Sequence, residues 1–126
     1  MIRGIGTDLV LVSRIEAALG RQGDRFARRI LTEAEWRRFA VHQQPARYLA
    51  KRYAAKEAIL KALGTGLAQG MSWQHIQIDN DGLGAPLVSL SGSAAARLEQ
   101  GGGGQMLLSL SDEREQALAF AIWSLG

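Results

Sequence analysis

The chain has 126 residues, which is the length of one domain and enough to bury a core without disulfides. It has no cysteine, which excludes disulfides and thiolate chemistry, and its histidines, His42 and His75, lack the spacing of a zinc site. The formal net charge is +3, and no run resembles a signal peptide or a membrane span. We therefore expect a soluble, cytoplasmic protein with a single domain over residues 1–126.

The chain begins with a predicted strand and two short predicted helices. Residues 2–12 are rich in Ile, Val and Leu with interleaved glycines, which is typical of a strand. Ser13 and Glu16 have the spacing of a capping box and predict a helix that ends near Gly20. A second short helix is expected through residues 25–31.

A longer helix is predicted near the middle of the chain. Thr32 and Glu35 repeat the capping-box pattern and predict the start of one more short helix. Pro45 is suited to the first turn of the long helix, which we expect from about residue 47 to residue 63. Gly64 is then a natural C′ residue.

The second half of the chain is dominated by predicted strands. Residues 92–100 form a short helical stretch, and the glycines at 101–104 form a loop. Four segments have strand patterns: residues 75–79, 86–91, 105–111 and 116–125. Helices early and strands late predict an α+β domain with an N-terminal strand, one long central helix and a mainly antiparallel sheet.

Positive charge is concentrated in the first half of the chain. Residues 14–52 contain ten Lys or Arg and four Asp or Glu. Such a surface can attract a nucleic acid, a phosphate-rich ligand or an acidic protein, and the alternative is simply a solvated arginine face.

Glu57 and Lys61 are charged residues on the long helix, which is apolar over most of its surface. Glu57 and Lys61 are four residues apart and project at the seam between a leucine-rich side and a strip of alanines. They form an ordinary i,i+4 ion pair if they are exposed. A partly buried carboxylate instead requires a partner, often a metal.

Asp8 is the second unusual acid, because aspartate is disfavoured in an apolar strand. The strand can end at Thr7, with Asp8 capping a turn. The neighbouring Gly4 and Gly6 favour another interpretation, since glycine in a strand often marks close approach of a ligand or another backbone. Asp8 and Glu57 together are the minimal protein contribution to a Mg²⁺ site completed by water and phosphate oxygens.

Four segments in order resemble the holo-acyl-carrier-protein synthase family of 4′-phosphopantetheinyl transferases. They are "GIGTDLVLVSRIE", "RYAAKEAILKALGTG", "DGLGAP" and "LSLSDEREQALAFAIW". The most specific elements are G-x-D near the start and, about 45 residues later, the run from Tyr53 to Lys61 that matches (aromatic)-x-x-K-E-A-x-x-K. The resemblance covers nearly the whole chain.

The resemblance implies transfer of 4′-phosphopantetheine from coenzyme A to a serine of apo acyl carrier protein, with release of 3′,5′-ADP. Asp8 and Glu57 are then the Mg²⁺ ligands, and Glu57 is the base that takes the serine proton directly or through a metal-bound water. Lys61 neutralises charge on the diphosphate. These roles suit phosphoryl-type transfer, which depends on positioning and on stabilisation by cations.

The resemblance also implies the residues that bind the co-substrate and the protein partner. The acidic carrier protein would dock on Arg14, Arg21 and Arg25, in an assembly of three chains with active sites between protomers. Coenzyme A would contact Arg52, Lys56, Lys61, Gly64, Thr65, Gly66, Gly84 and Pro86.

Two positions depart from the family pattern. Asp112 stands where many relatives have histidine, so a role of that histidine in phosphate binding does not transfer, and an aspartate would repel phosphate. Ala85 stands where a lysine is frequent, so one cation is missing. Neither departure touches the carboxylate pair.

Two other hypotheses remain from the sequence. A non-catalytic basic domain could bind RNA or DNA through residues 21–38, with Trp36 and Phe39 as stacking platforms. An inactive relative that only binds carrier protein is disfavoured, because Asp8, Glu57 and Lys61 are all present.

Overall fold

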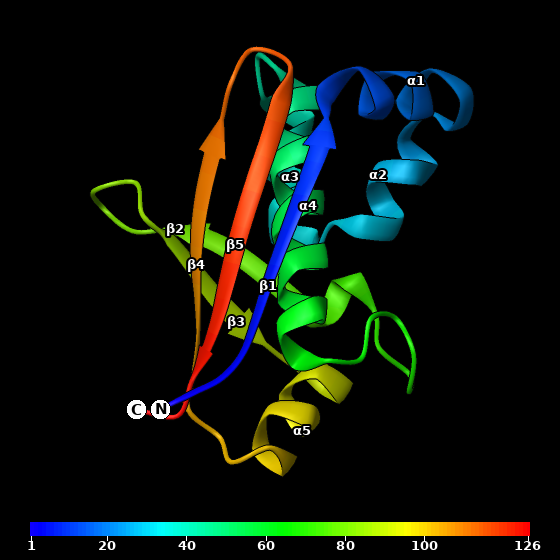
Figure 1. Ribbon diagram of the computed structural model, residues 1–126. Coiled ribbons are helices and arrows are strands. Elements are labelled where there is room, and N and C mark those ends of the chain that lie inside the picture. Colours follow the sequence, from blue (N-terminus) through cyan, green and yellow to red (C-terminus); the bar gives the residue numbers. More distant parts are fainter.

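The computed structural model describes all residues, 1–126, and places one long helix against a three-stranded sheet. Figure 1 shows β4, β5 and β1 side by side, with α4 behind them, α1 beyond the end of β1, and α2 below α1 at the right of the view. The elements are β1 (Ile2–Leu11), α1 (Val12–Gln22), α2 (Asp24–Ile30), α3 (Glu33–Val41), α4 (Pro45–Leu63), a 3₁₀ turn η1 (Trp73–His75), β2 (Ile76–Asn80), β3 (Pro86–Leu90), α5 (Gly92–Gln100), β4 (Gln105–Asp112) and β5 (Gln116–Ser124).

Both sheets are antiparallel. The larger sheet has the strand order β1-β5-β4, and β2 and β3 form a separate hairpin. The register of the larger sheet pairs Asp8 with Ala119 and Ala119 with Leu110. The predicted α+β class, the N-terminal strand and the mainly antiparallel sheet are confirmed.

Strand β1 lies against α4 with almost no side chain between the two backbones. A Cβ atom added at Gly4 would lie 2.1 Å from the Ala62 carbonyl oxygen, and one at Gly6 would lie 2.1 Å from the Ala58 oxygen. Both helix residues belong to the alanine strip, so small residues on both elements permit the contact. Of the predicted reasons for Gly4 and Gly6, the structure therefore supports close approach of another backbone.

The predicted start and end of α1 are wrong. The helix begins at Val12 with no side-chain cap, so the expected capping box of Ser13 and Glu16 does not form. The Val12 amide instead donates to the Glu115 carbonyl in the β4–β5 turn at 2.9 Å. The helix also continues past Gly20 and ends at Gly23, whose φ of 63° suits glycine.

The predicted signals around α3 and α4 are confirmed. Thr32 and Glu35 form both hydrogen bonds of a capping box. Helix α4 has Pro45 in its first turn, and Gly64 ends it in a left-handed conformation with φ of 80°. None of the helices in residues 1–126 is long and apolar enough to cross a membrane.

The outer face of the larger sheet, on the side away from α4, is apolar and exposed. Ile5 and Leu9 of β1 are 61% and 57% exposed, and Leu118 and Phe120 of β5 are 44% and 37% exposed. The register places Leu9 opposite Leu118 and Phe120 next to them. This outer face is a large apolar surface that a single chain leaves in contact with solvent.

Candidate functional site

The two predicted carboxylates lie on facing elements and line one groove. Residues of β1 alternate between the outer face and the α4 face, and Asp8 lies on the α4 face, with 19% of its side chain exposed. Glu57 lies on α4 between its buried and exposed sides. Asp8 and Glu57 both line a cavity of about 320 Å³. The structure thus brings together two acids that are 49 positions apart in the sequence.

Lys61 connects α4 to β1 at this groove. Its Nζ donates to the Thr7 carbonyl at 2.8 Å and to Asp8 Oδ1 at 3.2 Å. The ion pair that Lys61 forms is therefore with Asp8, not with Glu57 as in the simple i,i+4 alternative. The Lys61 ammonium partly offsets the two negative charges of the groove.

Tyr53 lines the same cavity as the two carboxylates. Its hydroxyl lies in the same cavity, where burial raises its pKa, and the charges of Glu57 and Asp8 raise this pKa further. Two carboxylates that line one cavity form a local negative centre, which favours a cation. Their ligand atoms are all oxygen, the type that Mg²⁺ prefers, so these residues fit the predicted metal.

Positive residues at the rim of this groove come from α1 and α2. Arg14 and Arg21 line the cavity together with Asp8 and Glu57. Arg25 is exposed on α2, which follows directly after α1. The predicted docking arginines are thus exposed on consecutive helices, and two of them border the acidic groove.

Lys56 lies elsewhere, in the protein interior. Its side chain is fully buried, and its Nζ donates to Glu35 Oε1 at 2.6 Å, to the Ile30 carbonyl at 2.8 Å and to the Trp73 carbonyl at 3.1 Å. These three bonds use all three N–H groups of the ammonium. The predicted contact of Lys56 with coenzyme A would require one of them to break, so the position of Lys56 does not fit that contact.

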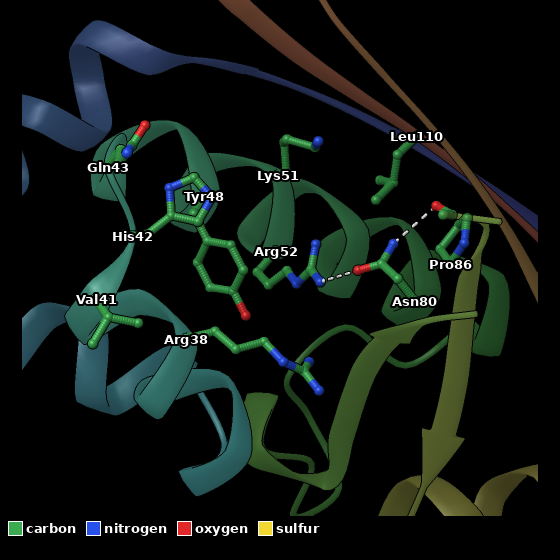
Figure 2. Close-up of a pocket in the computed structure, with 11 residues that line it drawn as sticks. Arg38, Val41, His42, Gln43, Tyr48, Lys51, Arg52, Asn80, Pro86 and Leu110 are labelled. Atoms are coloured by element: carbon green, nitrogen blue, oxygen red, sulfur yellow. Dashed lines mark hydrogen bonds between the residues drawn. The ribbon is translucent and has the colours of Figure 1, made fainter. Parts of the chain in front are cut away.

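Three other residues predicted to bind the co-substrate line a second, larger cavity. Arg52, Gly84 and Pro86 border a space of about 670 Å³ between α3, α4 and the β2–β3 hairpin, and Figure 2 shows its side chains. Arg52 donates to Asn80 Oδ1 at 2.9 Å, and Asn80 donates to the Gly84 carbonyl at 3.0 Å. The chain Arg52–Asn80–Gly84 fixes the wall of this cavity.

The two cavities lie on different sides of α4 and share no lining residue. At about 100° per residue, Arg52 and Glu57 project roughly 140° apart around the helix axis. One chain therefore does not bring the two predicted groups of co-substrate contacts together. The remaining predicted contacts, Gly64 to Gly66, form the turn that follows the last turn of α4, just beyond Lys61.

Asp112, one of the two departures from the family pattern, pairs with Lys51, which lines the larger cavity. Its carboxylate pairs with Arg47 at 3.2 Å and with Lys51 at 3.7 Å. Its negative charge is thus shared with two cations, which weakens the repulsion that the sequence predicts for a phosphate.

Sequence reasoning missed several residues of the larger cavity. Arg38 and Tyr48 line it, and Asn80 connects its wall. Arg38 and Tyr48 come from α3 and α4, and only the packing of the two helices brings them together. The available signal was a tyrosine four residues before Arg52, which places both on one helix face.

The aromatic residues proposed as nucleic-acid platforms are already packed. Phe39 is buried in the core, and the Arg28 guanidinium lies 3.8 Å from the centre of the Trp36 ring. Phe39 is therefore closed to a base, and the Trp36 ring already packs against Arg28 and Phe39, so the structure does not favour the nucleic-acid hypothesis.

Comparisons with known proteins identify the family to which this chain belongs. Residues 4–121 match the family described as the 4′-phosphopantetheinyl transferase superfamily. A holo-[acyl-carrier-protein] synthase of Shewanella amazonensis is 53% identical over 96% of this chain and 97% of its own length.

Solved structures of the same kind have the same fold. The holo-[acyl-carrier-protein] synthase of Neisseria meningitidis superposes with a TM-score of 0.93 at 43% identity and covers 98% of this chain and 99% of its own. A holo-(acyl-carrier-protein) synthase of Bacillus anthracis in complex with CoA (3′,5′-ADP) superposes with a TM-score of 0.80 at 34% identity, over 98% of this chain and 96% of its own.

Proposed function

Because this chain belongs to the 4′-phosphopantetheinyl transferase superfamily, we propose that it transfers 4′-phosphopantetheine from coenzyme A to a serine hydroxyl of apo acyl carrier protein. The observation that carries the proposal is the acidic groove, in which Asp8 and Glu57 share one cavity and Lys61 bonds to Asp8. The products are holo acyl carrier protein and 3′,5′-ADP.

In this reaction a bond forms between the serine oxygen and the β-phosphorus of coenzyme A, and the bond from that phosphorus to the 3′,5′-ADP oxygen breaks. Asp8 and Glu57 would hold Mg²⁺, which would supply Lewis-acid chemistry at the diphosphate. The Glu57 carboxylate lies at the groove wall and accepts the serine proton. The Lys61 ammonium, 57% exposed, balances the negative charge that grows on the leaving group.

The protein substrate is an acidic carrier protein that docks on Arg14, Arg21 and Arg25. All three arginines are exposed, and Arg14 and Arg21 border the groove that holds the carboxylates. A carrier protein bound there would present its serine to Glu57. Charged contacts of this kind raise the association rate and set the orientation of the partner.

The working form is a homotrimer in the cytoplasm, with active sites between protomers. Two features support this assembly. The apolar outer face of the β1-β5-β4 sheet is suited to burial against another copy. The acidic groove and the Arg52 cavity lie on different sides of α4, and a second chain can place its Arg52 cavity next to the groove of the first.

The test is transfer observed by mass spectrometry. Incubation with coenzyme A, Mg²⁺ and an apo acyl carrier protein should add the mass of one phosphopantetheine group to the carrier. EDTA, Asp8→Asn and Glu57→Gln should each reduce the rate by at least roughly 100-fold, the effect of losing one main stabilising group. Glu99→Gln, a matched change on exposed α5, should leave the rate unchanged.

Each outcome has a distinct consequence. Unchanged activity in both carboxylate variants would remove the metal assignment while the reaction remained. Absence of transfer to every carrier protein tested would reject the proposed function itself.

A further inference from the structure

The acidic groove contains one hydroxyl group to which the proposed function gives no role. It belongs to Tyr53, at a position where the family pattern requires only an aromatic ring. The hydroxyl lies in the cavity that Asp8 and Glu57 line. The other side chains around this cavity are apolar or charged, so Tyr53 is the one neutral hydrogen-bond donor of the groove.

Tyr53 and Glu57 are neighbours on α4. They are four residues apart, and side chains with this spacing lie one above the other on a helix surface. Helical side chains also lean towards the N-terminus of their helix, so the Glu57 carboxylate leans towards the turn that carries Tyr53. Burial raises the pKa of the Tyr53 hydroxyl and the charge of Glu57 raises it further, so the hydroxyl keeps its proton and remains a hydrogen-bond donor.

Glu57 differs from Asp8 in how it is held. Asp8 accepts a hydrogen bond from Lys61 at 3.2 Å, and Lys61 is itself fixed by the Thr7 carbonyl at 2.8 Å. Glu57 takes part in none of the salt bridges of this chain. A carboxylate that binds a metal needs a second group to orient it. The Tyr53 hydroxyl is the neighbouring group that can supply this orientation.

The Tyr53 ring is held by residues of two other elements. Its centre lies 6.5 Å from that of Phe26 in α2 and 5.9 Å from that of Trp73 in η1. Trp73 is in turn fixed to α4, because its carbonyl accepts a hydrogen bond from Lys56 Nζ at 3.1 Å. A ring that is packed in this way keeps its hydroxyl in a fixed direction, which a positioning group requires.

We propose that, in the working enzyme, the Tyr53 hydroxyl donates a hydrogen bond to the Glu57 carboxylate and holds it in the orientation that binds Mg²⁺ and accepts the serine proton. Tyr53 is thus a positioning residue, which acts through Glu57 and not on the substrate. A carboxylate has two oxygens with several acceptor positions, so one bond from a hydroxyl leaves others for the metal and the proton. The inference rests on the proposed function, which makes Glu57 the metal ligand and base.

The first experiment titrates the metal-free protein with Mg²⁺ in a calorimeter, with and without coenzyme A. Tyr53→Phe removes the hydroxyl and keeps the ring between Phe26 and Trp73. It should weaken Mg²⁺ binding about tenfold in both titrations, the effect of losing a group that orients a metal ligand. The urea midpoint should equal that of the wild type. Ser89→Ala, which removes an exposed hydroxyl from β3, should leave Mg²⁺ binding unchanged.

The second experiment measures transfer at several Mg²⁺ concentrations. Tyr53→Phe should raise the half-saturating Mg²⁺ concentration about tenfold. At a fixed, subsaturating Mg²⁺ concentration its kcat should fall, while the KM for coenzyme A and for the carrier protein should stay the same. In the Glu57→Gln background Tyr53→Phe should cause no further loss of rate, because a residue that acts only through Glu57 has no effect once this carboxylate is removed.

The results separate this inference from the proposed function. Unchanged Mg²⁺ affinity in Tyr53→Phe, or a further loss of rate when it is added to Glu57→Gln, would overturn the positioning role even if the wild type transfers normally. A higher KM for the carrier protein alone would overturn it too, because the hydroxyl would then contact the partner. Weaker Mg²⁺ binding in Tyr53→Phe, with no transfer by the wild type, would support the positioning of Glu57 and reject the transferase.

Discussion

Helix α4 buries two cations one turn apart, and the structure treats them differently. Lys56 has three hydrogen bonds, one of them to the Glu35 carboxylate, and no donor is left over. Arg52 has the Asn80 side chain and a long contact to a carbonyl, no carboxylate, and a free Nε. All donors of Lys56 are therefore used within the protein, whereas Arg52 keeps one donor without a partner.

The difference indicates what each residue does. The Lys56–Glu35 pair connects α3, α4 and β2, since Glu35 also accepts the Ile78 amide at 2.8 Å. It holds together the elements on which the neighbouring Glu57 depends. Arg52 also bonds β2, through the Asn80 side chain and the Ile78 carbonyl, but it has no acidic partner and borders a cavity. Buried charge of the same sign thus belongs to a fully paired network at one position and borders a cavity at the next.

The largest effect on stability should come from removing the carboxylate that pairs with Lys56. Glu35→Gln leaves the Lys56 ammonium buried without its counter-ion and should lower the free energy of unfolding by about 3–5 kcal/mol. Urea unfolding at pH 7 measures it. The double variant with Glu35→Met and Lys56→Met should lose much less, because it removes both charges. A loss below about 1 kcal/mol in the single variant would contradict a structural role for the pair.

The same single variant should respond to pH. Burial lowers the pKa of Lys56 below its ordinary 10.5, and loss of Glu35 removes a charge that counters this. The folded variant then binds fewer protons than the unfolded chain between the folded pKa and 10.5, so its stability should rise with pH in that window. Urea unfolding at two pH values below 10.5 tests the sign.

Removal of the Arg52 guanidinium should weaken binding of coenzyme A and leave the stability of the protein nearly unchanged. Arg52→Met should change the free energy of unfolding by less than about 1 kcal/mol, because no buried counter-ion is left behind. It should raise the KM for coenzyme A roughly 10- to 100-fold with little change in kcat. A stability loss as large as that of Glu35→Gln would show that the two cations are equivalent after all.

The exposed arginines Arg14 and Arg25 are a third kind of cation to compare with Lys56 and Arg52. Reversal of charge with Arg14→Glu and Arg25→Glu should raise the KM for the carrier protein about tenfold and leave kcat and stability nearly unchanged. High salt should reduce the difference from the wild type, since exposed charges are screened. Arg37→Glu on α3 is the matched control, and a pure loss of kcat would argue against docking.

The smallest effect concerns the pair at the rim of the larger cavity. A hydrogen bond from Gln77 and the pairing with Arg38 lower the pKa of Asp79 below its ordinary 3.8. The folded state then gains stability that is present above pH 3.8 and is lost as the pH falls through the lower folded pKa. Asp79→Asn should therefore cost at most about 1 kcal/mol at pH 7, and acid should abolish the difference.

Local patterns in the sequence predicted most of the elements. The Thr32–Glu35 capping box and the stop at Gly64 depend on residues close in sequence, and both are confirmed. The box of Ser13 and Glu16 was wrong because a partner 103 positions away, Glu115, bonds the first helical amide. A pattern of residues that are close in sequence cannot predict a hydrogen-bond partner so far along the chain.

The same limit applied to the site. Asp8 and Glu57 were found because an acid on an apolar element is conspicuous by itself. The partner of Lys56 was not, because Glu35 already had an evident role as a helix cap. One Glu35 oxygen bonds both Lys56 and the Thr32 amide, and the other bonds Ile78. Because its role as a helix cap already explained Glu35, its long-range pairing with Lys56 was not predicted.

The contact of Gly4 and Gly6 with α4 has a consequence for how this enzyme can vary. The main chain of β1 packs directly on the main chain of α4 at Gly4 and Gly6, and this contact sets the spacing of Asp8 and Glu57. Substitutions elsewhere in the groove can alter shape, charge and partner preference without moving the two acids relative to one another. The positions of the two acids are thereby independent of the surrounding surfaces, and a library of variants that keeps Gly4 and Gly6 can be tested against new carrier proteins with Asp8 and Glu57 unmoved.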